Sequence, residues 1–184
     1  MVMTVEDHVV LLDDEGRASG AAPRAEVHGR HTPLHLAFSC YVLDDDGRVL
    51  VTRRAPTKRT WPGVWTNAFC GHPRPGEAPA DAVRRRGREE LGLELVELTL
   101  VLPSFRYRAV DDSGMVEHEE CPVWFARAAG PVAADPDEVA QIQWVDAEDL
   151  GRAVTAAPWA FSPWLVAQVA CLAELDERPT AVGA

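Results

Sequence analysis

Two acidic segments that end in glycine constrain the fold of this chain most strongly. Residues 44–47 read Asp-Asp-Asp-Gly and residues 111–114 read Asp-Asp-Ser-Gly, and each separates two runs rich in apolar residues. Acidic residues followed by glycine favour tight turns between strands, because glycine tolerates the positive φ angles that such turns need. The chain is therefore expected to contain two β-hairpins. Their strands are predicted over residues 35–43 and 48–54, and over residues 95–108 and 115–126.

Helices are expected among these strands. Residues 79–91 begin with Pro79 and are followed by Gly92, and this pattern favours a helix with proline in its first turn and a glycine stop. Residues 16–33 are expected to form a loop and residues 178–184 a frayed tail. Two further helices are predicted over residues 146–155 and 162–177, and further strands over residues 8–12, 64–72 and 139–145.

The size and charge of the chain limit what it can bind. It has 184 residues without a repeat or a linker, so residues 1–184 predict one mixed α/β domain. A formal net charge of -11 argues against non-specific binding to nucleic acid or to an anionic membrane. No apolar run reaches the roughly 20 residues of a membrane span, and the first residues do not resemble a signal peptide. We expect a cytoplasmic protein with a small anionic ligand, and its sequence leaves monomer and dimer equally open.

A cysteine and a histidine lie two residues apart in the strand-like segment 64–72. Alternation along a strand would place Cys70 and His72 on the same face. A thiol can carry a proton, and a neighbouring imidazole can bind a metal. A lone cysteine is more often a small buried hydrophobe, which is the expectation for Cys40, Cys121 and Cys171. A functional role for Cys70 and His72 therefore has to be supported by other residues of the chain.

Two glutamates flank His118 on a predicted strand. Alternation places Glu117 and Glu119 on one face and His118 on the other. Two carboxylates that face inward would repel one another, and this would raise the pKa of one of them. A metal cation beside them would relieve the repulsion. Taken alone, the same two residues would be assigned to the solvent face of a hairpin.

Residues 71–93 resemble the Nudix box, whose carboxylates line one helix face and hold Mg²⁺ against a diphosphate. The residues that match the box are Gly71, Glu77, Arg85, Glu89, Glu90, Gly92 and Leu93. Arg86 stands where the box has a glutamate, and Gly87 where it has an aliphatic residue. A cation in place of a metal ligand favours holding a diphosphate intact over hydrolysing it. The resemblance implies the Nudix fold, a mixed β-sheet sandwiched between helices.

A larger set of segments resembles the type I isopentenyl-diphosphate isomerases, a branch of the Nudix superfamily. In order, the matching pieces are His28 and residues 34–38, 51–54, 61–67, 70–73, 105–108, 117–119 and 158–164. They cover most of the chain between residues 24 and 165, so this resemblance is far more specific than the box alone. It implies an enzyme of isoprenoid biosynthesis that interconverts isopentenyl diphosphate and dimethylallyl diphosphate through a carbocation-like intermediate.

The resemblance assigns residues to this chemistry. Moving an unactivated double bond needs two acid/base groups on opposite sides of the substrate, an electron-rich surface and exclusion of water. Cys70 and Glu119 are implied as the acid/base groups, and which carbon each serves is left open. Tyr107 would hydrogen-bond Glu119 and help relay the proton. Trp164 would present its ring to the developing cation.

The resemblance also implies two metal sites and an anchor for the diphosphate. One divalent ion, with zinc, manganese and magnesium all open, would be held by His28, His35, His72, Glu117 and Glu119. A second ion, Mg²⁺, would sit on the diphosphate and be held by Glu90 and the backbone carbonyl of Cys70. The phosphates would be bound by Arg24, Arg54, Lys58 and Arg86.

Two other functions compete with the isomerase. A Nudix-type pyrophosphohydrolase is the first alternative, and Arg86 argues against it. The second is a non-catalytic binding protein that uses the same fold as a sensor. A sensor needs no proton carriers such as Cys70 and Glu119, so their presence argues against it.

Overall fold

The computed structural model describes residues 8–176 and divides the strands between two mixed sheets. The larger sheet has the order β12 (Val139–Val145), β5 (Val49–Arg54), β4 (Phe38–Leu43), β11 (Val123–Ala129) and β8 (Glu94–Leu102), with β6 (Trp65–Thr66) paired to β5 and β7 (Phe69–Gly71) paired to β4. The smaller sheet has the order β2 (Ala18–Pro23), β1 (His8–Leu12), β3 (His35–Leu36), β10 (Val116–Glu120) and β9 (Arg106–Val110). The tail predicted over 178–184 lies outside the described residues.

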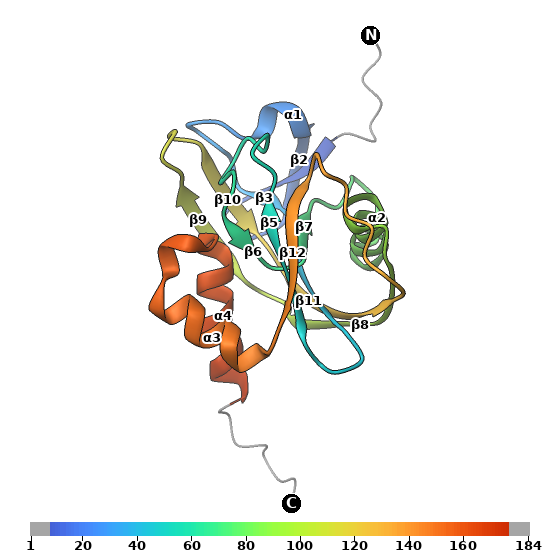
Figure 1. Ribbon diagram of the computed structural model, residues 1–184. Helices are drawn as coiled ribbons and strands as arrows, with labels where there is room; N and C mark the ends of the chain where they lie inside the picture. The colour runs from blue at the N-terminus through green and yellow to red at the C-terminus, as the bar shows by residue number, and fades with distance from the viewer. Residues whose placement is uncertain (1–7, 177–184) are drawn as a thin grey trace, which may run out of the picture.

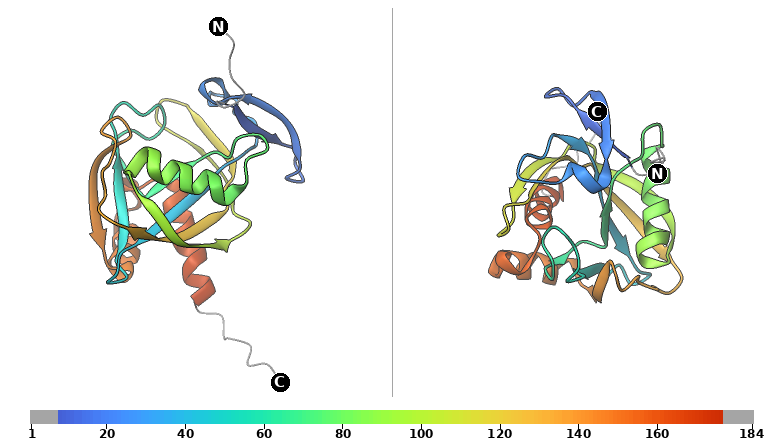
Figure 2. Two further views of the ribbon diagram at one scale, coloured as in Figure 1. Left: turned by 90° about the vertical axis from the view of Figure 1, so that its right-hand side faces the viewer. Right: turned by 90° about the horizontal axis from the view of Figure 1, so that it is seen from above.

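Helices lie on both sides of the strands (Figures 1 and 2). On one side, α2 (Pro79–Leu91) packs against β7 and β8. On the other side, α3 (Ala147–Ala156) and α4 (Pro163–Asp176) pack together, joined by the short 3-10 helix η2 (Pro158–Ala160). This arrangement confirms the predicted architecture of a mixed sheet between helices. Within the described residues, no helix is long and apolar enough to cross a membrane.

Both predicted hairpins are present, and their turns use the expected chemistry. Leu43 pairs with Val49 across the first turn, and Val110 pairs with Val116 across the second. Each turn is stabilised by an aspartate side chain that accepts backbone N–H groups, and each contains a glycine with positive φ. The helix predicted over 79–91 has the same bounds in α2, and Gly92 ends it with φ of 61°.

Five local predictions were wrong because tertiary pairing decides these segments. The strand predicted over 95–108 divides into β8 and β9, and the strand predicted over 115–126 divides into β10 and β11; the two parts of each join different sheets. The expected loop 16–33 contains β2 and the short helix α1 (Arg24–Val27). The sequence of β2 shows no strand-like alternation, and its conformation follows from antiparallel pairing with β1. The strand predicted over 35–43 divides into β3 and β4, which join different sheets. The strand predicted over 64–72 is broken between β6 and β7 around Asn67, whose amide donates to the carbonyls of Cys40 and Phe69.

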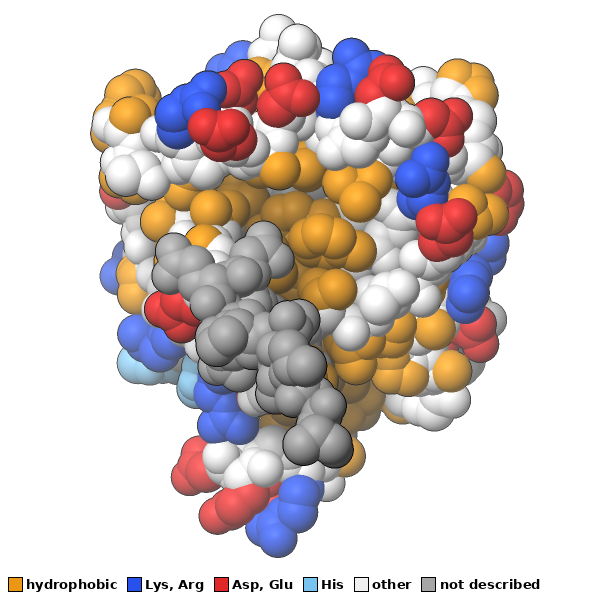
Figure 3. All heavy atoms as spheres, turned by 90° about the horizontal axis from the view of Figure 1, so that it is seen from below, with side chains coloured by type: hydrophobic (Ala, Val, Ile, Leu, Met, Phe, Trp, Pro, Cys, Tyr) orange, Lys and Arg blue, Asp and Glu red, His pale blue; other side chains and the backbone are white. Residues whose placement is uncertain are grey.

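Two hydrophobic cores fill the space between the layers. The first lies under α2 and includes Phe38 and Phe69, whose rings meet edge to face. The second lies under α3 and α4 and includes Leu150 and Leu165. Several residues packed against the second core are only partly buried. Figure 3 shows one face of the molecule on which apolar side chains gather in a hollow, with charged side chains around it.

Gly71 allows α2 to approach β7 closely, and we expect its replacement by alanine to destabilise the fold. A Cβ at position 71 would lie 2.7 Å from Cγ of Arg86 and 2.8 Å from the ring of Phe38. Such overpacking costs about 1–3 kcal/mol of unfolding free energy, measurable by chemical denaturation. Gly151→Ala in α3 is the control, because a Cβ there would meet no atom beyond the helix's own backbone within 4 Å. It should stabilise α3 by about 0.5–1 kcal/mol. Equal unfolding free energies for the two variants would contradict this reading.

Candidate active site

A cavity of about 570 Å³ receives side chains from both sheets and from α1, α2 and α4. All the predicted site residues line it except His35, which is fully buried behind the cavity wall. Glu117 and Glu119 both face this cavity and are buried, so they do not form the solvent face of a hairpin. His118 does not line the cavity, as the alternation along β10 predicts.

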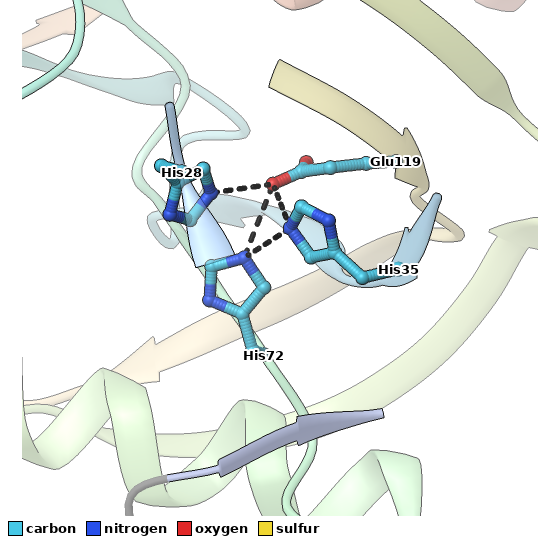
Figure 4. Close-up of side chains that lie close together, drawn as sticks. All are labelled: His28, His35, His72 and Glu119. Atoms are coloured by element: carbon cyan, nitrogen blue, oxygen red, sulfur yellow. Dashed lines mark hydrogen bonds and ion pairs between the residues drawn. The ribbon is translucent and has the colours of Figure 1, made fainter. Parts of the chain in front are cut away.

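Three imidazoles and one carboxylate converge at the inner end of the cavity (Figure 4). His28 directly follows α1, His35 lies on β3, His72 follows β7, and Glu119 lies on β10. Their ligand atoms all lie within 4.8 Å of one another. Oε1 of Glu119 is 3.1 Å from Nε2 of His72, 3.5 Å from Nε2 of His35 and 4.0 Å from Nε2 of His28. Strand pairing brings two of these residues together, because Glu119 is the direct neighbour of His35 in the parallel register of β10 and β3.

Glu117 extends this cluster at the side of His28. Its Oε2 lies 2.9 Å from Nε2 of His28, but the two buried atoms have no well-directed hydrogen bond. Burial opposes charge on His28, yet Glu117 and Glu119 outweigh it and raise the pKa of His28 to about 9. Burial and the charge of Glu119 raise the pKa of Glu117. A buried set of three imidazoles with two carboxylates fits a divalent cation.

Glu119 and Tyr107 form a hydrogen-bonded pair beside this cluster. The Tyr107 hydroxyl donates to Oε2 of Glu119 at 2.8 Å, across the β9–β10 register that pairs the two residues. Burial opposes ionisation of Glu119, but its contacts with His28, His35 and His72 hold its pKa well below the usual range. Burial also lowers the pKa of His72 to about 4, although the bond to Glu119 opposes this. Glu119 is thus an ionised carboxylate beside neutral His72.

Cys70 faces the cavity from β7 in the larger sheet. Its Sγ lies 3.3 Å from the Ser39 hydroxyl and donates to Oδ1 of Asn67 at 3.5 Å. Burial raises the pKa of the thiol to about 12, while the hydrogen bond from Ser39 lowers it. At neutral pH the group is therefore a thiol that retains its proton. Cys70 and Glu119 come from different sheets and border the same cavity.

Trp164 supplies an aromatic surface from the first turn of α4. Its indole N–H donates to Thr66 at 3.0 Å and to Oδ1 of Asn67 at 3.1 Å, which fixes the ring orientation. The guanidinium of Arg54 lies 5.3 Å from the ring centroid. This distance is typical of a cation–π contact. Arg54 also donates to the backbone carbonyls of Thr60 and Trp61, so it organises this loop as well as lining the cavity.

Basic side chains from α2 and from the loop after β5 also line the cavity. Arg86 and Lys58 line it and pair with Glu138, and Arg86 also pairs with Glu90. The side chain of Arg86 is only 12% exposed, so its ion pair with Glu90 lies in the cavity wall and not on a solvated helix surface. Burial opposes this charge, but Glu90 and Glu138 raise the pKa of Arg86 above its usual value. Burial raises the pKa of Glu90.

Several residues of this site were missed in the sequence. Glu138 lines the cavity between Lys58 and Arg86, and no sequence pattern pointed to it. Asn67 lies in a matching segment, but its role in holding Trp164 and Cys70 became visible only with the fold. His8 also lines the cavity, although it is not part of the metal-ligand cluster. The box residues Glu77 and Arg85 form a two-bond ion pair, and Arg85 also donates to the His72 carbonyl.

Known proteins are similar to this chain over most of its length. A family model described as the NUDIX domain matches residues 33–165. A curated isopentenyl-diphosphate Delta-isomerase of Clavibacter michiganensis is 62% identical over 164 residues, which are 89% of this chain and 84% of the relative. The isopentenyl-diphosphate Delta-isomerase of Paenarthrobacter aurescens is 53% identical over 182 residues, which are 99% of each chain.

Solved structures agree on the fold. A crystal structure of a Deinococcus radiodurans protein has a TM-score of 0.69 at 19% identity and covers 89% of this chain and 98% of its own. The crystal structure of a MutT protein from Methanosarcina mazei has a TM-score of 0.65 at 16% identity and covers 79% of this chain and 97% of its own. At these identities the likeness concerns the fold alone.

Proposed function

Because this chain belongs to the isopentenyl-diphosphate Delta-isomerase family of Nudix-domain proteins, we propose that Cys70 and Glu119 transfer the two protons of that reaction. The enzyme interconverts isopentenyl diphosphate and dimethylallyl diphosphate. The observation that carries the proposal is the placement of Cys70 and Glu119, which enter one cavity from different sheets. A substrate between them would meet an acid/base group on each side.

The residues of the cavity support both proton transfers. One group gives a proton to the double bond, and the other takes a proton from a carbon on the far side of the allylic unit. A cationic centre develops between these steps, and the ring of Trp164, held by Asn67 and Thr66, offers an electron-rich surface for it. Tyr107 holds Glu119 in place and can pass its proton onward. Glu119 and Trp164 are buried and Cys70 is partly buried, which limits the access of bulk water to the cation.

We assign the inner cluster to one divalent cation. His28, His35, His72 and Glu119 would hold it, with Glu117 at its edge. When bound, the ion offsets the repulsion between the two carboxylates and sets the acidity of Glu119. Zinc, manganese and magnesium all remain candidates, because imidazole and carboxylate groups together accept each of them.

We assign the basic side chains that line the cavity to the diphosphate. Arg24, Lys58 and Arg86 would bind its oxygens, with Arg54 at the boundary to the reacting carbons. Mg²⁺ on the diphosphate would be held by Glu90 and the carbonyl of Cys70. Ion pairs with Glu138 hold Lys58 and Arg86 at the cavity wall. Such an anchor keeps the leaving group attached while the cation forms. We expect this chemistry to take place in the cytoplasm.

Replacing Arg86 by glutamate tests the diphosphate anchor. The variant exchanges a buried cation for an anion beside Glu89, Glu90 and Glu138, so the cavity should repel a diphosphate. We expect the KM for isopentenyl diphosphate to rise by at least about tenfold, the effect of losing one charge-assisted hydrogen bond. Steady-state assays should follow both dimethylallyl diphosphate and released phosphate.

The exposed Arg88 on the same helix provides the matched control. It pairs with Glu94 and does not line the cavity, so Arg88→Glu should leave the KM unchanged. An unchanged KM in Arg86→Glu would remove Arg86 from the substrate site. Phosphate release by the parent enzyme at a rate similar to isomerisation would favour the pyrophosphohydrolase.

A further inference from the structure

A chain of buried hydrogen bonds connects α4 to the sulfur of Cys70. Ser39 on β4 is the direct antiparallel partner of Cys70 on β7, and its Oγ lies 3.3 Å from the Cys70 sulfur. Gln168 on α4 donates from Nε2 to this Oγ at 2.9 Å. The Tyr41 hydroxyl donates to Oε1 of Gln168 at 3.0 Å. Ser39 and Gln168 are both fully buried, so their polar atoms depend on these partners.

The orientation of the Gln168 amide sets the directions of these hydrogen bonds. Gln168 presents its oxygen Oε1 to the Tyr41 hydroxyl and its nitrogen Nε2 to Ser39. An amide N–H can only donate, so the Ser39 oxygen accepts this bond. The hydroxyl hydrogen of Ser39 is then left for a sulfur atom, and two are within reach. Cys70 lies at 3.3 Å and Cys121 at 3.4 Å.

These two acceptors match the two protonation states of Cys70. While the sulfur carries its proton, the thiol donates to Oδ1 of Asn67 at 3.5 Å, and the Ser39 hydroxyl can turn to Cys121. After the thiol has given its proton to a substrate carbon, the sulfur needs a donor, and the Ser39 hydroxyl can turn to it. A rotation of the Ser39 hydroxyl hydrogen thus accompanies the loss of the Cys70 proton, and no heavy atom has to move.

We propose that Ser39 and Gln168 are positioning residues for the isomerisation: Gln168 directs the Ser39 hydroxyl to the Cys70 sulfur whenever that sulfur has lost its proton. This proposal rests on the role of Cys70 in the proposed function. Helix α4 thereby contributes two residues that act on the surroundings of the thiol. Trp164 and Gln168 lie four residues apart on one face of this helix. Trp164 orients the acceptor Asn67, and Gln168 orients the donor Ser39.

The proposal predicts a loss of kcat without a loss of substrate binding. Ser39→Ala removes the donor to the sulfur but no group that lines the cavity, so kcat should fall about 10- to 100-fold with KM unchanged. Gln168→Met keeps a side chain of similar volume but removes the amide that orients the Ser39 hydroxyl. Its kcat should fall by a smaller factor than that of Ser39→Ala. Cys40→Ala is the matched control, because Cys40 is equally buried on β4 and packs in the core under α2.

An isosteric pair separates hydrogen bonding from packing. Thr and Val at position 39 have the same shape, and only Ser39→Thr keeps a hydroxyl, so its kcat should exceed that of Ser39→Val at least tenfold. Equal kcat values for this pair, or a parental kcat in folded Ser39→Ala, would overturn the proposal. A raised KM with unchanged kcat would overturn it as well. If Cys70→Ala is inactive while these results are negative, only the positioning role fails and the proposed function stands.

Discussion

Replacing Cys70 by alanine is expected to lower kcat by about 10²–10⁴-fold, the usual contribution of one general acid or base. The thiol borders the cavity from β7 and is held between Ser39 and Asn67, so its removal deletes a proton carrier from one side of the substrate. The loss of one sulfur atom from a partly buried position should leave the fold intact. Steady-state kinetics with isopentenyl diphosphate and a thermal unfolding curve measure the two effects separately.

Cys171→Ala is the control for this variant. Cys171 is a partly buried cysteine of α4 that packs against the second core and does not line the cavity. It should keep the parental kcat. Activity of Cys70→Ala within a few-fold of the parent enzyme would exclude the thiol as a proton carrier.

Replacing Glu119 by glutamine should have an effect of similar or larger size. Glu119 contacts all three histidines of the cluster and accepts a hydrogen bond from Tyr107, so one substitution weakens the metal site and removes a proton carrier. We expect kcat to fall by at least about 10²–10⁴-fold. The affinity for a divalent ion, measured by competition with a chelator, should fall in the same variant.

The neighbouring Glu120 offers a control of the same chemistry. Its carboxylate points away from the cavity and pairs with Arg106 at 2.8 Å. Glu120→Gln should therefore retain kcat and metal affinity, and lose at most about 1 kcal/mol of stability. Equal activity of the two glutamine variants would contradict the assignment of Glu119.

Local patterns predicted those parts of the structure that local chemistry determines. Pro79 and Gly92 marked both ends of α2, because proline and glycine act on the backbone beside them. Alternation on β10 correctly placed Glu117 and Glu119 on one face and His118 on the other. The resemblance to a family then named further site residues, and all of these except His35 line the cavity.

Features that depend on distant contacts could not be found in this way. The strand β2 has no intrinsic strand pattern and exists because β1 pairs with it. The bond from Gln168 to Ser39 joins residues 129 positions apart, so no local window contains both. Glu138 directly precedes β12, and Lys58 lies in the loop that follows β5. The two residues meet only because β12 pairs with β5. In each case the missing information was the pairing of elements.

Isomerisation in D₂O tests the opposed pair of acid/base groups most directly. If Cys70 and Glu119 exchange protons with solvent on either side of the substrate, turnover must place deuterium on the new methyl group of dimethylallyl diphosphate. Reversal must place deuterium on C2 of the recovered isopentenyl diphosphate. Mass spectrometry and NMR of both compounds at partial conversion measure this label. Deuterium at both carbons is the expected result, whereas isomerisation without solvent label at either carbon would show a direct hydrogen shift and contradict the mechanism.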